Sequence, residues 1–169
     1  RSLPYQYGDL GQEKRIIAEH VKSYCLDHRI VCDIEWDERQ RIYGDSWLDF
    51  LGACKATLGT ESGSNLFDDD GSLRKKFVEF LRKNPNADYM VARSAVLGSH
   101  TETPIMNQIS PRIFEAILCG TGLVLFEGSY SGVIEADRHF LALRKDFSNI
   151  DDIFRKLECD EGIQEMVDR

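Results

Sequence analysis

Short apolar runs alternate along this chain with longer stretches in which apolar residues recur at helical spacing. The runs are rich in aliphatic and β-branched residues, and they read IVCDI (30–34), KATLG (55–59), GLVLF (122–126) and HFLAL (139–143). Continuous apolar runs of this length are typical of strands that are buried on both faces. Helices between such strands cover both sides of a parallel sheet. The pattern therefore predicts an α/β fold with a parallel sheet and helices on both faces.

Helix signals fill the segments between the runs. The apolar stripe of Leu73, Phe77 and Phe80 predicts a helix that begins at residue 72 and stops near Asn84-Pro85. Residues 86–98 are compatible with a helix and SHTETP (99–104) with a loop. The other helices are expected over 10–28, from 46, over 110–119, from 148 or 149, and from about 161.

Composition narrows the class of protein. The 169 residues suit one domain, 1–169, and because the chain begins at Arg1 rather than Met we expect a piece of a longer protein. The formal net charge is −8, and no basic cluster is interleaved with aromatic residues, which argues against a nucleic-acid partner. No apolar run approaches the roughly 20 residues of a membrane span, and no leader sequence is expected. Five widely spaced cysteines without a C-x-x-C pair favour a reduced, cytoplasmic protein.

Metal binding is not expected. FDDDG places Asp68, Asp69 and Asp70 in a row, but the spaced oxygen ligands and terminal Glu of a calcium loop are missing. A solvated loop or a helix N-terminus explains the three acids more simply.

Two loops follow predicted strands and are candidate ligand sites. In parallel sheets, ligands bind outside the carboxyl ends of the strands. ESGSN follows KATLG, and EGSYSG follows GLVLF. Backbone amides and hydroxyls there could approach a phosphate, or the loops could be ordinary turns. The candidates are Glu61, Ser62, Gly63, Tyr130, Ser131 and Gly132.

The predicted helix over 110–119 carries one unexpected carboxylate. Ser110 is placed to cap its first amides, Pro111 suits the first helical position, and Gly120 suits a left-handed stop. Glu115 lies off the apolar stripe of this helix, so it is either a solvated side chain or an acceptor for a ligand diol. The stripe expected to face the sheet consists of Ile113, Phe114, Ile117 and Leu118.

The segment SPRIFEAILCGTGLVLFEG resembles the C-terminal donor-binding domain of GT-B glycosyltransferases. The likeness lies on Glu115, Ala116, Cys119 and Gly120 followed by an apolar strand, and it is nearest to the spore-coat, CgeB-like group of the group 1 type. It implies one Rossmann-like half of a GT-B fold that binds a nucleotide-diphosphate sugar, with no cofactor and no metal. The partner it implies is an N-terminal acceptor-binding domain.

The resemblance also implies roles for particular residues. Glu115 would hold the ribose, with Ser110 and Arg112 as neighbouring ligand-binding candidates, and Arg1 and Lys14 would grip the diphosphate. Asn107 stands where many relatives have an acidic residue that contacts the donor sugar. An amide can bind a hydroxyl there but supplies no negative charge.

Two other functions remain open from the sequence. A non-catalytic module of the same fold could serve assembly or binding to a carbohydrate surface. A flavodoxin-like regulatory domain would need a phospho-acceptor, for which Asp33 is the candidate, but no matching Lys and Thr are apparent.

Overall fold

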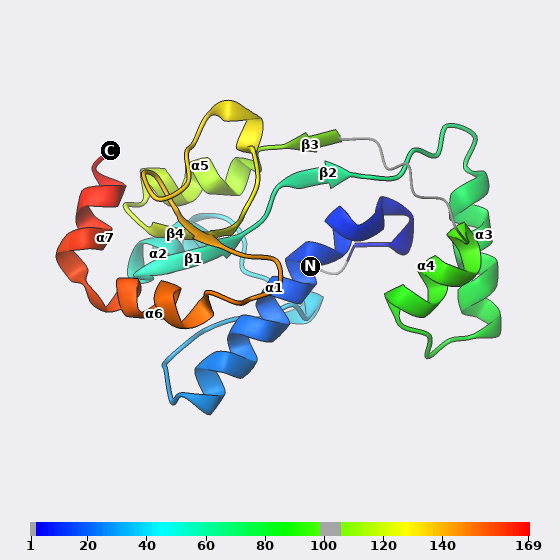
Figure 1. Ribbon diagram of the computed structural model, residues 1–169, viewed down its shortest axis with the longest axis horizontal. Helices are drawn as coiled ribbons and strands as arrows, with labels where there is room; N and C mark the ends of the chain where they lie inside the picture. Colours follow the sequence, from blue (N-terminus) through cyan, green and yellow to red (C-terminus); the bar gives the residue numbers. More distant parts are fainter. Residues whose placement is uncertain (1–2, 99–105) are drawn as a thin grey trace.

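A three-stranded parallel sheet forms the centre of the computed structural model, which describes residues 3–98 and 106–169. The strands are β1 (Ala56–Gly59), β4 (Gly122–Phe126) and β5 (Leu141–Leu143), in the order β1-β4-β5 (Figure 1). Ala56 pairs with Gly122, and Val124 pairs with Leu141. The predicted α/β fold with a parallel sheet is confirmed.

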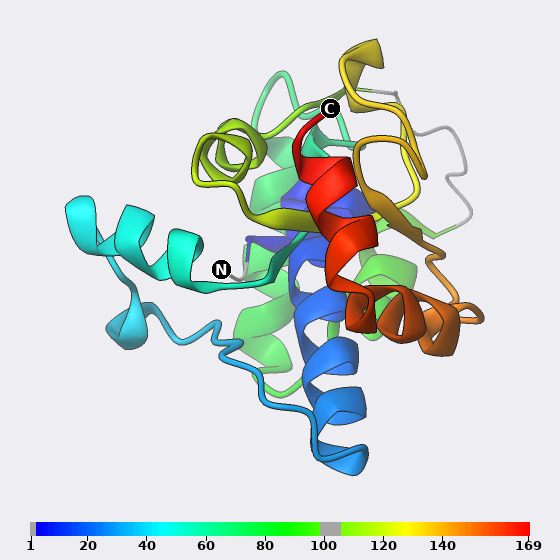
Figure 2. The same ribbon diagram turned by 90° about the vertical axis from the view of Figure 1, so that its left-hand side faces the viewer.

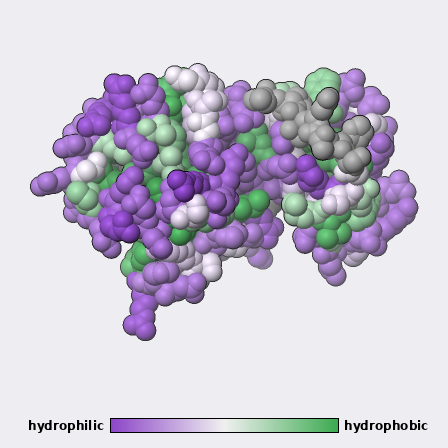
Figure 3. Space-filling model, in the orientation of Figure 1, coloured by the Kyte–Doolittle hydropathy of each residue, from purple (hydrophilic) through white to green (hydrophobic). Residues whose placement is uncertain are grey.

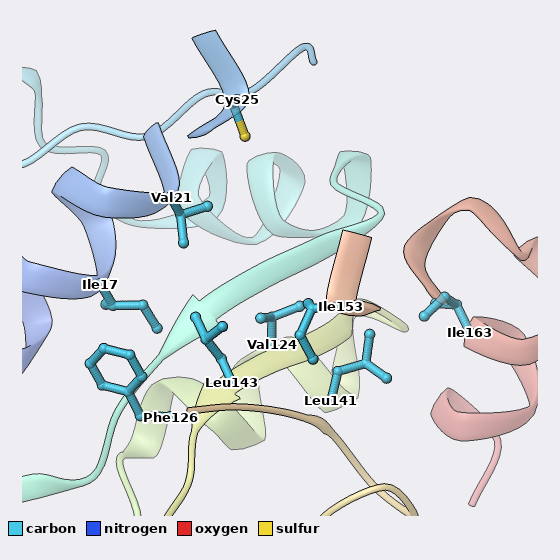
Figure 4. Close-up of a cluster of buried hydrophobic side chains, with 9 residues drawn as sticks. All are labelled: Ile17, Val21, Cys25, Val124, Phe126, Leu141, Leu143, Ile153 and Ile163. Carbon is cyan, nitrogen blue, oxygen red and sulfur yellow. The ribbon is translucent and has the colours of Figure 1, made fainter. Parts of the chain in front are cut away.

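Helices cover both faces because successive side chains of the central strand point in opposite directions. All of β4 is buried. Val124 and Phe126 face a cluster with α1 (Gly8–Asp27), α6 (Ile150–Glu158) and α7 (Asp160–Val167) (Figure 4). Leu123 and Leu125 face α5 (Pro111–Leu118). Figure 2 shows α5 and α2 (Asp45–Ala53) on one side of the molecule and α6 and α7 on the other.

A second, two-stranded sheet connects this centre to a pair of helices. β2 (Ser62–Ser64) pairs antiparallel with β3 (Met106–Gln108), an arrangement that the sequence did not predict. Beyond β2 the chain forms α3 (Ser72–Lys83) and α4 (Tyr89–Leu97), and Phe77, Ala92 and Leu97 form their own small core. Figure 3 shows this helix pair as a separate lobe of the surface. The predicted loop SHTETP lies outside the described residues.

The prediction of a strand at 30–34 is wrong. These residues form no strand, so β1 lies at the edge of the sheet. Cys32 and Ile34 pack against the core cluster, whereas Val31 is fully exposed. One side of the segment is therefore partly buried although its backbone pairs with no strand. Three short 3-10 helices, Tyr5–Tyr7, Glu38–Gln40 and Tyr130–Gly132, complete the described elements.

The predicted apolar stripe of α5 is also wrong in part. Ile113 and Ala116 are buried, but Phe114, Ile117 and Leu118 are 42%, 41% and 87% exposed. The small side chain of Ala116 lies at the contact with the sheet, so the buried arc of α5 is narrow. Pro111 occupies the first turn and Gly120 has a φ of 67°, as expected, but the Ser110 side chain accepts no capping hydrogen bond.

Within residues 3–98 and 106–169, every helix is too short or too polar to span a lipid bilayer.

Candidate functional site

Several candidate residues lie at the end of the sheet at which its strands stop, here called the carboxyl edge. Glu61 and Ser62 follow β1, and Tyr130 follows β4. α5 precedes β4 after a short turn, so it runs back along the sheet and its N-terminus points to this edge (Figure 1). α2, which precedes β1, extends to the side of the sheet in Figure 2. Parallel strands bring segments that are distant in sequence together at this edge.

The Glu61 side chain connects its own segment to β3 and to the loop after β4 by hydrogen bonds. Its side chain is buried, and it accepts hydrogen bonds from Asn107 Nδ2 at 2.9 Å, Ser129 Oγ at 3.1 Å and the Tyr130 amide at 2.8 Å. We call these four residues the Glu61 cluster. Three donors offset the cost of removing a carboxylate from water. Glu61 and Asn107, which the sequence nominated as ligand-binding residues, thus bind each other.

Lys14 joins this edge from α1. Its Nζ donates to Ser62 Oγ at 2.9 Å, so two predicted site residues are in contact. The neighbouring Glu13 accepts a hydrogen bond from Lys145 Nζ at 2.6 Å, and Lys145 follows β5. Burial raises the pKa of the Glu13 carboxyl, against the opposing effect of Lys145. The edge therefore holds two lysines on an otherwise acidic protein.

The loop after β4 is held in an uncommon backbone conformation. Tyr130, Ser131 and Gly132 have φ values of 46°, 56° and 68°. For residues with a side chain, this region costs of order 1 kcal/mol each. The Tyr130 side chain is fully buried, its hydroxyl donates to the Phe126 carbonyl at 2.6 Å, and burial raises its pKa. Ser131 Oγ accepts a hydrogen bond from the Ile109 amide at 3.2 Å, which fixes the loop beside the start of α5.

Gly63 has a structural reason to be glycine. It lies in β2 opposite Asn107 with a φ of 128°. A Cβ atom there would lie 2.1 Å from the Met106 carbonyl oxygen. The close approach of β3 therefore requires glycine whether or not a ligand binds.

Glu115 and Arg112 meet at a residue that the sequence did not nominate. Trp47 Nε1, from the first turns of α2, donates to Glu115 Oε2 at 2.7 Å. The Arg112 guanidinium lies 5.0 Å from the centroid of the same indole. We call Trp47, Arg112 and Glu115 the Trp47 cluster. Because the hydrogen bond joins residues 68 apart, no local pattern could have revealed Trp47.

The structure thus groups the candidates into two clusters: the Glu61 cluster at the carboxyl edge, and the Trp47 cluster between α2 and α5. Among residues 3–98 and 106–169, no hydrogen bond or ion pair that we identify joins the Trp47 cluster to the Glu61 cluster. Arg1 lies outside the described residues. Ser110 lies at the start of α5 beside Ile109, whose amide binds Ser131.

Comparisons with known proteins assign no family to this chain. No protein-family model, curated protein or solved structure matches it. The fold class therefore rests on the sheet and its helices, and the choice of ligand rests on the side chains at the carboxyl edge.

The acidic run of FDDDG begins a helix. Asp68 accepts hydrogen bonds from the amides of Leu73 and Arg74, each at 2.9 Å, and Asp70 accepts one from the Ser72 amide at 2.8 Å. These carboxylates satisfy the first free amides of α3. Within the described part of the chain, no three His, Cys, Asp or Glu residues are grouped so as to hold a metal ion.

Proposed function

We propose that this chain is the nucleotide-sugar-binding domain of a GT-B-type glycosyltransferase. The observation that carries the proposal is the contact between Lys14 and Ser62 at the carboxyl edge, 2.9 Å from Nζ to Oγ. It brings the cation from the N-terminal half of α1 against the first residue of β2, just after the end of β1. Open parallel sheets bind phosphate-bearing ligands at this edge, where a lysine supplies a point charge.

In this proposal each part of the site has a chemical task. Lys14 and the Ser62 hydroxyl bind the diphosphate, with backbone amides of the loop at 130–132 near the terminal phosphate. Glu115 accepts hydrogen bonds from the ribose. As glycosyl transfer proceeds, negative charge grows on the departing diphosphate, and a fixed cation stabilises it without a metal ion. A second domain of the same protein would bind the acceptor and complete the enzyme. We propose that this enzyme acts in the cytoplasm.

The proposal is tested by calorimetric titration of the chain with uridine, guanosine, adenosine and cytidine diphosphates. We expect at least one of them to bind. Lys14→Met should weaken that binding by about 10- to 150-fold, because a hydrogen bond to a charged group contributes about 1.5–3 kcal/mol.

Lys55→Met is the matched control. Lys55 directly precedes β1, at the opposite end of the sheet, and it forms an exposed ion pair with Asp160. Its loss changes the net charge equally, but exposed pairs contribute at most about 1 kcal/mol to stability. Equal losses of affinity in the two variants would contradict a local role for Lys14. No binding of any of the four diphosphates would contradict the proposed function and favour a non-catalytic module.

A further inference from the structure

Trp47 hydrogen-bonds α2 to α5, in addition to a hydrogen bond near the other end of α2. α2 buries a single residue, Leu51. The Leu51 carbonyl already accepts a hydrogen bond from the buried Thr121 hydroxyl at 2.7 Å, which fixes the end of α2 near the start of β4. Trp47 lies about one turn N-terminal to Leu51 in α2, and its bond to Glu115 is a second link between α2 and the segment of α5 and β4.

The two charges beside Trp47 do not neutralise each other. Arg112 and Glu115 are three residues apart on α5, a spacing at which opposite charges can pair. Among the described residues, neither takes part in an ion pair that we identify. Instead, the indole N–H holds Glu115 Oε2, and the guanidinium lies over the face of the ring. Both charged groups thus contact Trp47.

The geometry leaves one side of the carboxylate for a ligand. Glu115 is only partly exposed, and its Oε2 is occupied by Trp47. Its Oε1 accepts no hydrogen bond from any side chain in the described part of the chain. A carboxylate oxygen has lone pairs for hydroxyl donors, and a side chain whose rotation is already fixed loses less entropy on binding.

We infer that Trp47 is a positioning residue for a nucleotide-binding site: it orients Glu115 so that Oε1 receives the ribose hydroxyls. The inference rests on the proposed function. Trp47 does not itself contact the ligand. The rival view is that the bond from Trp47 to Glu115 only holds α2 against α5. That view predicts an effect on stability but none on the recognition of ribose.

The test compares each ribonucleoside diphosphate with its 2′,3′-dideoxy analogue, which lacks both hydroxyls. Their affinity ratio is measured by calorimetry in the unaltered chain, in Trp47→Phe and in Glu115→Gln. A variant that is partly unfolded loses apparent affinity for both ligands equally, so the ratio reports only on the hydroxyls. We expect Trp47→Phe to lower the ratio by about 2- to 10-fold, the range for one hydrogen bond.

Trp36→Phe is the matched control. The chain has two tryptophans, and Trp36 lies under Lys22 at 4.9 Å, without contact to Glu115. Its substitution should leave the ratio unchanged. In the double variant of Trp47→Phe and Glu115→Gln, the ratio should equal that of Glu115→Gln alone, because Trp47 acts through Glu115.

The possible failures are distinct. If no ribonucleoside diphosphate binds the unaltered chain, the proposed function fails, and this inference fails with it. If one binds and Glu115→Gln lowers the ratio while Trp47→Phe does not, the role of Trp47 is wrong and the proposed function stands. If both variants leave the ratio unchanged, Glu115 does not recognise ribose, and Trp47 has only a structural role.

Discussion

The carboxylate of Glu61 shows how one residue can organise an edge of the sheet. Its partners, Asn107, Ser129 and Tyr130, come from two other segments of the chain. All three are neutral donors, and their hydrogen bonds stabilise the negative charge. Glu61 holds the loops in which the other candidates lie, and this gives it a role in the folded state that requires no ligand.

Glu61→Gln should lower the free energy of unfolding by about 1–3 kcal/mol. The Gln side chain has an NH2 group in place of one acceptor oxygen, so a hydrogen-bond donor would face the donor groups of the cluster. Chemical denaturation would measure the change. Glu127→Gln is the control: Glu127 is exposed three residues before Tyr130, and surface substitutions change stability by roughly 0.5 kcal/mol or less. Equal effects of the two substitutions would mean that the three hydrogen bonds contribute nothing measurable.

At the scale of an element, α5 has a narrower buried face than its sequence suggests. Ile113 and Ala116 contact the sheet, while Phe114 and Leu118 face solvent. A helix that contacts a sheet through an alanine lies close to it, so only residues near the line of contact are covered. The apolar side chains on the outer face of α5 therefore add little to the core.

Stability measurements on α5 separate its two faces. Ile113→Ala should cost about 2–5 kcal/mol, because it leaves a cavity against Leu123 and Leu125. Phe114→Ala should cost about 1 kcal/mol or less, although it removes more atoms, because Phe114 is 42% exposed. Urea denaturation of both variants would show the difference. A larger loss for Phe114→Ala would mean that Phe114 is covered in solution.

At the scale of the whole molecule, the carboxyl edge concentrates charge. Lys14, Lys145 and Glu13 come from α1 and from the chain after β5, and Glu61 lies close enough to raise the pKa of Glu13 further. Desolvation is the main reason for that raised pKa. The folded protein therefore binds a proton at Glu13 more readily than the unfolded chain does.

The sign of the pH dependence follows from this raised pKa. As pH falls from 7 toward 4.5, the native state takes up the proton at Glu13 first, so this group stabilises the fold increasingly. The free energy of unfolding of the unaltered chain, minus that of Glu13→Gln, should rise over this interval. Chemical denaturation of both chains at several pH values measures that difference. The contributions of the other titrating groups largely cancel, because the two chains share them. A difference that falls on acidification would show that Lys145, not burial, dominates the pKa.

The sequence by itself determined the features that depend on neighbours along the chain. The apolar runs predicted β1, β4 and β5, and Pro111 and Gly120 occupy the helix start and stop expected of them. It also nominated Lys14 and Ser62, which contact each other in the structure, and Glu61, which follows β1. These predictions succeed because helix and strand periods, and the backbone preferences of proline and glycine, act over a few residues.

Only the tertiary structure decided which residues meet. The pairs Trp47 with Glu115, Glu61 with Asn107 and Glu61 with Tyr130 join positions 68, 46 and 69 residues apart. The exposure of Phe114 and the absence of a strand at 30–34 likewise depend on which surface each segment packs against. A local pattern records that a residue is apolar or charged, but burial and partnership depend on the path of the whole chain, which brings distant segments to one edge.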